Sequence, residues 1–348
     1  MRVLVTGHHG YIGAVLVRML SKTSNEVVGL DSDFFAQNRF VGDVIEIPSL
    51  HRDLRDIQPR DLFGFDAVLH LAALSNDPLG DLNPQLTYEI NHRATMRLAG
   101  MAKQAGVKRF LFSSSCSMYG AAGSSMLTED APFRPVTPYA ESKVFVEQEL
   151  GELASPHFSP VFLRNTTAYG VSPFMRFDVV LNNLVAWAVT TGSIKIQSDG
   201  TPWRPLVHVE DICRAFLAAL VAPQETIHNQ AFNVGITEEN YQVRDLAEIV
   251  RETVPGCKLE YSPDGGPDPR SYRVDFSKIK NHLPGFAPQW NVRRGAQELY
   301  DACRQANLKL EEFDGPRFKR ITHIRKLLAS GQLDSQLRWT APVSASAL

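Results

Sequence analysis

The chain has 348 residues, of which 44% are hydrophobic and 21% charged, and its formal net charge is −2. This length and composition predict a globular protein with one large and one smaller domain, and they exclude a disordered chain. The charge excludes the basic surface by which nucleic-acid-binding proteins are known. The four cysteines lack metal-ligand spacing, and the N-terminus shows neither a signal peptide nor an apolar stretch of membrane-spanning length. We therefore expect a cytoplasmic protein with no metal and no nucleic-acid or membrane partner.

The first half of the chain alternates β-rich runs with helical patterns. The β-rich runs occupy residues 2–6, 26–31, 66–72, 109–115 and 160–166, and the helical patterns occupy 13–21, 84–105 and 139–153. The runs VLVTG, AVLHLAA and FLFSSS are apolar almost throughout, as is typical of parallel strands buried on both faces. Because strands that alternate with helices form βαβ units, the expected fold of residues 1–169 is α/β, with a Rossmann-type doubly wound parallel sheet.

The pattern changes near residue 170. A helix is predicted over 178–190, a strand–turn–strand segment within 193–212, a strand at 231–235, and helices over 211–221 and 243–254. We expect residues 170–340 to form mainly a smaller C-terminal α/β cap, with the chain crossing back to the main sheet. The stretch after about residue 290 matches no motif.

The segment TGHHGYIG, at residues 6–13, directly follows the first strand and opens a helix. Gly7 permits a tight turn, Gly10 lets the backbone approach a pyrophosphate, and Gly13 lets the helix and the strand pack closely. The helix N-terminus offers free N–H groups and the positive end of its dipole to phosphates. In this strand–turn–helix context the spacing predicts a dinucleotide site rather than a plain glycine turn.

Two acidic residues follow later strands of the same half. Asp31 ends the second strand, where a carboxylate accepts hydrogen bonds from the adenosine ribose and repels a 2′-phosphate. We therefore expect NAD as the cofactor and NADP to be disfavoured. Asp53 is predicted either to reach the adenine or to cap a helix.

A tyrosine and a lysine mark the reacting centre. Tyr139 and Lys143, in YAESK, have the spacing that places two side chains on one face of a helix. An ammonium group beside a phenol lowers the pKa of the phenol, which makes it an acid/base near neutral pH. The segment FSSSCSMYG ends a buried strand with hydroxyl groups, at the edge where parallel sheets place reactive groups.

Together these motifs resemble those of the extended short-chain dehydrogenase/reductase family, the NAD-dependent epimerases, dehydratases and reductases of nucleotide sugars. TGHHGYIG, HLAALS, INHRAT, FSSSCSMYG, YAESK and GTPWRPLVHVEDICRA each resemble a family motif. The likeness extends from residue 1 to about residue 290. It implies that Tyr139 is the catalytic acid/base, that Lys143 binds the nicotinamide ribose, and that Ser115 hydrogen-bonds the reacting oxygen.

The resemblance also implies cofactor contacts, a substrate and an assembly. The expected NAD contacts, besides Tyr139 and Lys143, are Gly7, Gly10, Tyr11, Ile12, Gly13, Asp31, Asp53, Leu54, Leu71, Ala72, Ala73, Asn91 and Ser113. The expected substrate is a nucleotide-diphosphate sugar. The assembly that the resemblance implies is a homodimer with a four-helix interface, in which residues 84–105 and 139–153 take part.

Arginines and small polar residues are the candidates for binding the sugar nucleotide. Arg204 and Arg270, with Arg273 as a further candidate, suit a diphosphate because guanidinium groups bind phosphate oxygens in pairs. The other expected substrate contacts are Ser75, Ser117, Thr167, Asn182 and Asn183. Two departures from the family pattern leave the sugar open, since Pro205 follows Arg204 and Thr167 replaces an asparagine. The histidines at 70, 92 and 208 are expected to be packed rather than catalytic, and His8 and His9 to point away from the cofactor.

Several reactions remain compatible with these motifs. An epimerase or a 4-ketoreductase needs only Ser115, Tyr139, Lys143 and a hydride carrier. A 4,6-dehydratase needs a further acid and base, and Cys116 and Ser117 stand where the dehydratases of this family have an Asp-Glu pair. A reductase of a non-nucleotide carbonyl compound would keep the same triad, and a non-catalytic dinucleotide-binding regulator would not need it. Cys116 is expected to be buried packing.

Overall fold

The computed structural model describes residues 1–75, 77–120, 125–196, 198–261 and 271–341. Its centre is a seven-stranded sheet in the order β3-β2-β1-β4-β5-β7-β11, in which every neighbouring pair is parallel. The strands are β1 Arg2–Thr6, β2 Glu26–Asp31, β3 Ser49–His51, β4 Ala67–His70, β5 Arg109–Ser115, β7 Ser159–Asn165 and β11 Gln230–Val234. The strand order reverses between β1 and β4, which is where such sheets bind ligands.

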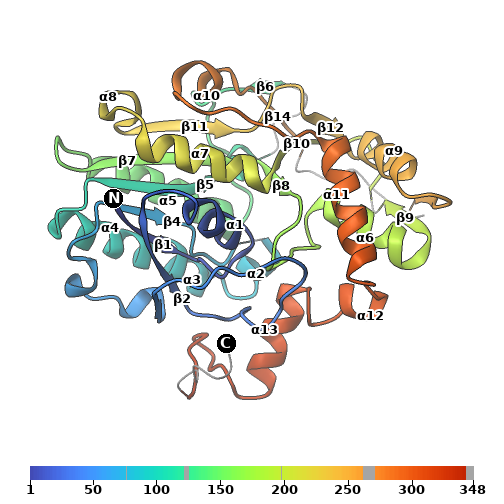
Figure 1. The fold of residues 1–348 in the computed structure, drawn as a ribbon, viewed down its shortest axis with the longest axis horizontal. Helices are drawn as coiled ribbons and strands as arrows, with labels where there is room; N and C mark the ends of the chain where they lie inside the picture. The colour runs from blue at the N-terminus through green and yellow to red at the C-terminus, as the bar shows by residue number, and fades with distance from the viewer. Residues whose placement is uncertain (76, 121–124, 197, 262–270, 342–348) are drawn as a thin grey trace.

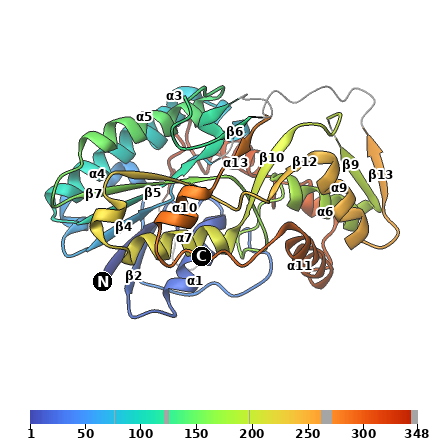
Figure 2. The same ribbon diagram turned by 90° about the horizontal axis from the view of Figure 1, so that it is seen from above.

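Helices cover both faces of the sheet, giving three layers (Figures 1 and 2). On one face, α1 (Tyr11–Leu20) and α7 (Val209–Val221) pack on strand residues such as Val3 and Val5. On the other face, α4 (Ala94–Gln104) and α5 (Pro138–Glu152) pack on Leu4 and its neighbours. Because side chains alternate along a strand, Leu4 faces one layer and its two neighbours face the other. The predicted doubly wound parallel sheet is confirmed.

The remaining sheets and helices form the rim around the ends of these strands. The small sheets combine β6 Met126–Leu127, β8 Thr167–Tyr169, β9 Ser193–Ile196, β10 Trp203–His208, β12 Asn240–Gln242, β13 Lys258–Tyr261 and β14 Arg273–Val274. The larger helices there are α6 Val180–Thr191, α9 Val243–Thr253 and α11 Val292–Gln305, which pack on one another. Residues 209–234 return from this rim to the central sheet as α7 and β11. Among the described helices, none has the length and apolar character that crossing a bilayer takes.

Shorter elements complete the chain. They are α2 Asp77–Asp81, α3 Pro84–Thr87, α8 Gln224–Ile227, α10 Ser277–His282, α12 Leu310–Phe313, α13 Arg320–Ala329, and three 3₁₀ turns at Leu54–Asp56, Pro59–Leu62 and Cys116–Tyr119. The helix α13 and the residues that follow it lie beneath α2 and the loop after β2 (Figure 1). The unassigned C-terminal stretch therefore covers part of the sheet edge where the first motifs lie.

The predicted helix over 84–105 is interrupted. It consists of α3, a π-helical turn at Tyr88–Arg93 and α4, which follow one another without a loop. A π turn is closed by a hydrogen bond between residues five positions apart instead of four. It changes the spacing of hydrophobic residues along the helix only slightly, so this spacing does not reveal it. The predicted strand at 66–72 is also shorter, because the chain leaves the sheet after His70.

Candidate active site

A cavity of about 840 Å³ lies at the carboxyl ends of the central strands. It extends from the glycine-rich loop after β1, past the end of β5 and the start of α5, to β10 and α6. Its volume is at the upper end of the range for ligand pockets, about 300–1,000 Å³. One continuous cavity thus joins the predicted dinucleotide site to the predicted reacting centre.

The glycine positions of the loop at one end of this cavity have no room for a side chain. Gly7 has φ +74°, and a Cβ atom there would lie 2.8 Å from the Ala72 backbone nitrogen. A Cβ atom on Gly13 would lie 2.0 Å from the Gly7 carbonyl oxygen. The helix α1 begins after Gly10 without a side-chain cap, so its first N–H groups are free to bind phosphate. The loop therefore fits the pyrophosphate of a dinucleotide.

The acidic residues Asp31 and Asp53 line the same end of the cavity. The Asp31 carboxylate is held in place by the backbone N–H groups of His9, at 3.0 Å, and Asp33, at 2.9 Å. Asp53 caps the 3₁₀ turn Leu54–Asp56 by accepting from the Arg55 N–H, and it also forms an ion pair with the Arg55 side chain. The predicted cap is confirmed, and because Asp53 also lines the cavity, its contact with the adenine stays a prediction.

Ser115, Tyr139 and Lys143 meet at the centre of the cavity wall. Ser115 is the last residue of β5, and its side chain hydrogen-bonds the Tyr139 hydroxyl. Thr137 caps the N-terminus of α5 by accepting from the Ala140 N–H, which fixes the turn that presents Tyr139. The Lys143 ammonium lies 5.6 Å from the centre of the Tyr139 ring and donates to the Ser113 carbonyl at 2.7 Å. This arrangement can move a proton to or from an oxygen bound beside Ser115.

A family model described as "NAD dependent epimerase/dehydratase family" matches residues 3–235. The chain belongs to this family. It is 29% identical over 314 residues to a UDP-glucose 4-epimerase of Lactobacillus helveticus, an alignment that covers 83% of this chain and 92% of that protein. It is 26% identical over 326 residues to UDP-glucuronic acid decarboxylase 1 of Arabidopsis thaliana, covering 90% of this chain and 72% of that one.

Solved structures agree with this membership. MoeE5 in complex with UDP-glucuronic acid and NAD superposes with a TM-score of 0.76 at 28% identity, covering 88% of this chain and 100% of that chain. The UDP-Glc/GlcNAc 4-epimerase of Campylobacter jejuni superposes with a TM-score of 0.71 at 26% identity, covering 87% and 99% of the two chains. The predicted family and enzyme class, an NAD-dependent epimerase/dehydratase of the extended short-chain type, are therefore confirmed.

Most of the residues that the family motifs single out line the cavity. On the cofactor side they are Gly7, Gly10, Tyr11, Ile12, Gly13, Asp31, Asp53, Leu54, Leu71, Ala72, Ala73 and Ser113, and on the substrate side Ser75, Ser117, Thr167, Asn183 and Arg204. The Ser117 hydroxyl is buried without a hydrogen-bond partner in the described part of the chain, so it is available to a ligand. Arg270 lies outside the described residues.

Two asparagines expected at the site do not line the cavity. Asn182 is fully buried, and its amide binds the Gly170 N–H, the Arg176 carbonyl and the Tyr11 hydroxyl. Asn91 accepts from the Leu74 N–H and donates to the Leu74 carbonyl. Both amides thus bind backbone groups and hydroxyls behind the cavity wall, so these residues shape the site without lining it. The nearby Arg273 is also absent from the wall, and its guanidinium lies over the Trp203 ring.

The pKa of Tyr139 differs from the expectation. Burial raises it above the ordinary tyrosine value, while Arg176 and the Ser115 hydrogen bond act in the opposite direction. Lys143 was expected to lower it, but burial instead lowers the pKa of Lys143 itself to about 7, against the attraction of Glu147. In the cofactor-free protein Lys143 is therefore only partly protonated at neutral pH, which weakens its effect on the phenol.

Cys116 and Ser117 occupy the positions directly after Ser115. They belong to a 3₁₀ turn rather than to the strand, so strand alternation does not apply to them. Cys116 is nevertheless buried, and its thiol donates to the Arg164 carbonyl, which confirms that it is packing. Burial raises the pKa of this thiol well above its ordinary value, so it is no acid near neutral pH.

His70 and His208 are packed, as predicted, whereas His92 is only partly buried and pairs with Glu149 at the surface. His70 binds the Thr6 and Thr95 hydroxyls, and burial followed by the charge of Lys143 lowers its pKa to about 3, which keeps it neutral. The neighbouring loop histidines, His8 and His9, face Gly29 and Asp33 and are not part of the cavity wall.

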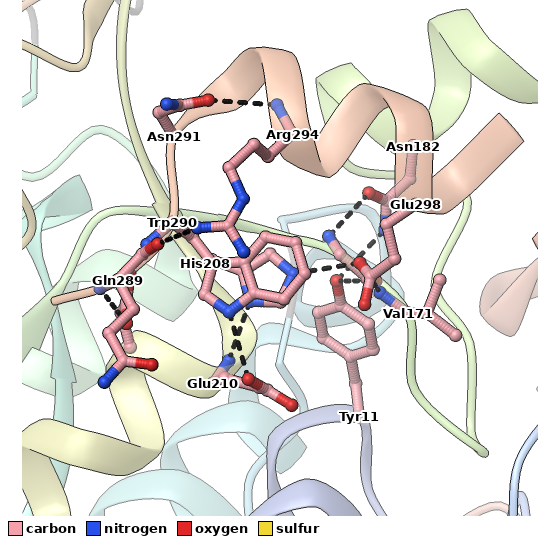
Figure 3. Close-up of polar contacts among 12 residues, drawn as sticks. Tyr11, Val171, Asn182, His208, Glu210, Gln289, Trp290, Asn291, Arg294 and Glu298 are labelled. Atoms are coloured by element: carbon pink, nitrogen blue, oxygen red, sulfur yellow. Dashed lines mark hydrogen bonds and ion pairs between the residues drawn. The ribbon is translucent and has the colours of Figure 1, made fainter. Parts of the chain in front are cut away.

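His208 belongs to a buried network that supports the cofactor loop from behind (Figure 3). Its ring stacks on that of Trp290 at 3.9 Å and binds Glu298 of α11 at 2.9 Å. Glu298 accepts from the Val171 N–H, and the Gly170 carbonyl beside it accepts from the Tyr11 hydroxyl at 2.7 Å. Trp290 and Glu298 thus help to hold Tyr11 and the start of α1 in place, which sequence motifs had not shown.

Three arginines in the cavity wall were missed by sequence reasoning: Arg52, which pairs with Asp61, Arg176 and Arg320. Arg176 forms a bidentate ion pair with Asp178 and donates to the Ser75 carbonyl at 3.1 Å. Arg320 donates to the Ser75 hydroxyl at 3.1 Å. None of the three lies in a recognised motif, and an isolated arginine before a helix is usually at the surface, so the sequence held no signal that separates them from solvated residues.

Proposed function

We propose that this protein is an NAD-dependent epimerase of a nucleotide-diphosphate sugar, with a UDP-sugar as the first substrate to test. The observation that carries the proposal is that Ser115, Tyr139 and Lys143 lie together in one cavity. The same cavity is lined by the glycine loop, which is followed by a helix without a side-chain cap. The similarity to UDP-glucose 4-epimerases over most of both chains supports the choice of reaction and nucleotide.

NAD bound in the cavity would accept a hydride from the sugar carbon and return it. Tyr139 takes the proton of the sugar hydroxyl as that hydride leaves, and Ser115 donates a hydrogen bond to the same oxygen. When hydride returns to the opposite face of the ketone, Tyr139 gives the proton back. No external reductant is consumed, so the cofactor is restored in each cycle.

A 4,6-dehydratase is disfavoured by the chemistry of the two positions after Ser115. Elimination of water needs one group to take a proton from carbon and another to protonate the departing hydroxyl. Cys116 is buried with a raised pKa, and a serine hydroxyl such as that of Ser117 does not titrate usefully. A 4-ketoreductase uses the same triad as the epimerase, but it would consume NADH stoichiometrically.

Decarboxylation is the second candidate, favoured by the match to UDP-glucuronic acid decarboxylase 1 over 90% of this chain. Oxidation of a glucuronic acid at C4 creates a β-keto acid, which loses CO₂, and hydride return then gives the pentose. The same Tyr139 and Ser115 would serve this route. Product analysis separates the two reactions, because only decarboxylation shortens the sugar.

The test is incubation of the purified protein with NAD and UDP-glucose, UDP-galactose, UDP-N-acetylglucosamine or UDP-glucuronic acid, followed by chromatography of the products. We expect a 4-epimer without net NADH formation. Arg204→Ala should raise the KM for the substrate and leave NAD affinity unchanged, because Arg204 lines the far end of the cavity from the glycine loop. A 4-keto-6-deoxy product would overturn the proposal, and stoichiometric NADH use would favour the ketoreductase.

We propose a preference for NAD over NADP, set by Asp31. Its carboxylate is held by two backbone N–H groups and cannot easily swing away from a 2′-phosphate. Asp31→Ala should bring the ratio of the dissociation constants for NADP and NAD closer to one, as measured by parallel titrations with the two cofactors. Asp33→Asn, which leaves the Asp31 carboxylate in place, is the control. Tighter binding of NADP by the unmodified protein would contradict the assignment.

We further propose a cytoplasmic homodimer. The four cysteines are all described and all free, which suits a reducing compartment. Phe145 of α5 is 40% exposed beside Tyr88 and His92 of the π-helical turn, an apolar site on the helices that the family resemblance places at a dimer interface.

A further inference from the structure

The C-terminal segment, residues 320–341, contributes to the cavity wall, although it lies beyond the family model, which ends at residue 235. Its apolar side chains pack on those of α2, α3 and the loop after β2, and together they form a core of their own. His323 binds the Phe34 carbonyl at 2.8 Å, and Trp339 donates to the Ser32 carbonyl at 2.6 Å. The segment is therefore anchored to the residues that directly follow Asp31.

Arg320, the first residue of α13, is the only residue of this segment in the cavity wall as described. It is only 9% exposed, it donates to the Ser75 hydroxyl, and its guanidinium lies 4.5 Å from the centre of the Phe35 ring. Within the described residues it forms no ion pair with a carboxylate. A guanidinium has five N–H donors, so a single bond to a neutral hydroxyl leaves most of them available.

The surroundings of Arg320 favour an anionic ligand. Burial and the neighbouring positive charge of Arg176 lower the pKa of Arg320 to about 10. Arg176 forms an ion pair with Asp178, whereas Arg320 forms none with a described residue, and the carboxylates of Asp178 and Asp31 attract it only from a longer distance. Because a buried cation without a counter-ion destabilises a fold, an anion that enters the cavity at this place would be bound strongly.

The position of Arg320 identifies which anion. Phe35 and Ser75 flank it, and the Asp31 carboxylate is near enough for its charge to influence it. The same cavity wall contains Tyr11, which opens the helix α1 with its free N–H groups, and Asp31, for which we proposed contact with the adenosine ribose. The candidate for the substrate diphosphate, Arg204, comes from β10 in the rim.

We propose that Arg320 binds the pyrophosphate of the NAD cofactor, so that the C-terminal helix completes the dinucleotide site from the side opposite the glycine loop. The proposal rests on the proposed use of NAD. It assigns a binding role to a segment that none of the sequence motifs covers. It also explains why α13 and the residues after it are anchored to the loop after β2, through His323 and Trp339.

The test is isothermal titration of the full-length protein, freed of nucleotide, with NAD, ADP-ribose and UDP. Arg320→Met keeps the apolar length of the side chain and removes the charge. We expect this variant to bind NAD and ADP-ribose about 10- to 100-fold more weakly, the loss expected for a charge-assisted hydrogen-bond pair. UDP affinity should stay within about twofold, since it reports the other end of the cavity. Arg325→Met, an exposed arginine one turn along the same helix, should change none of these affinities.

Each other outcome overturns the proposal. Unchanged affinity for NAD and ADP-ribose would show that Arg320 does not contact the cofactor, and a selective loss of UDP affinity would assign it to the substrate. If Arg320→Met does not fold, Arg320→Lys replaces it, with an expected loss of several-fold because the charge remains while the paired donors are lost. An unmodified protein that binds neither NAD nor ADP-ribose would instead contradict the proposed function.

Discussion

Tyr139 has two groups beside it that favour its ionised form, Arg176 and Ser115, yet burial still raises its pKa. Among the described residues of the wall, no other tyrosine lies at the start of α5 next to the β5 hydroxyl groups. A buried phenol is well suited to hold a proton until a substrate oxygen lies within hydrogen-bonding distance. Catalysis should therefore depend on this hydroxyl more than cofactor binding does.

Tyr139→Phe removes only the hydroxyl. We expect turnover to fall about 10²- to 10⁴-fold, the usual contribution of a general acid/base. NAD affinity should change little, because the ring and Lys143 remain. Steady-state kinetics and an NAD titration of the same preparation check both statements. Activity within a few-fold of the unmodified enzyme would remove Tyr139 from the mechanism.

Lys143 makes the stability of the cofactor-free protein depend on pH. Its pKa in the folded protein, about 7, is below the ordinary lysine value, so the unfolded chain binds more protons between about pH 7 and pH 10. The destabilising effect of the buried ammonium is complete below pH 7 and disappears as pH rises. The free energy of unfolding of the unmodified protein should therefore increase relative to that of Lys143→Met from pH 7 to pH 9. Urea unfolding of both proteins at each pH measures this difference in the free energy of unfolding. A difference that stays the same from pH 7 to pH 9 would contradict the lowered pKa of Lys143.

At the scale of elements, a buried ion pair fixes α5 against the sheet. Glu147 of α5 binds Arg164 of β7 through both carboxylate oxygens, at distances from 2.7 to 3.1 Å. Arg164 also donates to the Tyr119 hydroxyl. Glu147 lies one turn after Lys143 on α5. Its ion pair with Arg164 therefore fixes the rotation of the helix that carries Tyr139 and Lys143.

Removing one partner of such a pair leaves a buried charge. Glu147→Ala should therefore lower the free energy of unfolding by about 3–5 kcal/mol. Glu149→Ala is the matched control on the same helix, since Glu149 is half exposed and pairs with His92 at the surface. Its expected effect is about 0–1 kcal/mol. Equal effects of the two substitutions, measured by denaturant unfolding, would show that the Arg164 pair does not stabilise the fold.

At the scale of the whole molecule, the exposed Phe145 predicts how two copies associate. A charge at this position would be buried without a partner in a dimer formed through α5 and the π-helical turn, so Phe145→Asp should yield monomers. Light scattering after size-exclusion chromatography measures the mass. Phe63→Asp is the control, because Phe63 is 61% exposed and follows a 3₁₀ turn away from α5. A monomeric unmodified protein, or a dimer that survives the Phe145 change, would contradict the proposed interface.

Those parts of the fold that are set by residues close together in sequence could be predicted. The bounds of β1, β2 and β5 agree with the apolar runs, because a strand buried on both faces is apolar at every position. The glycine loop and the Tyr139–Lys143 pair followed from spacing, since turn geometry and helix periodicity are local. By contrast, the π-helical turn within the 84–105 segment leaves the hydrophobic pattern almost unchanged, and so it was not predicted.

The α/β class, the glycine loop and the spacing of Tyr139 and Lys143 could all be predicted from the chain alone. The packed fold was needed to show that Asn182 binds groups behind the cavity wall, that burial raises the pKa of Tyr139, and that Arg320 reaches Ser75 across 245 positions of the chain. This is because hydrogen-bond partners, desolvation and electrostatic fields depend on residues that are distant in sequence. Local patterns specify elements, but the environment of a side chain exists only once those elements have packed.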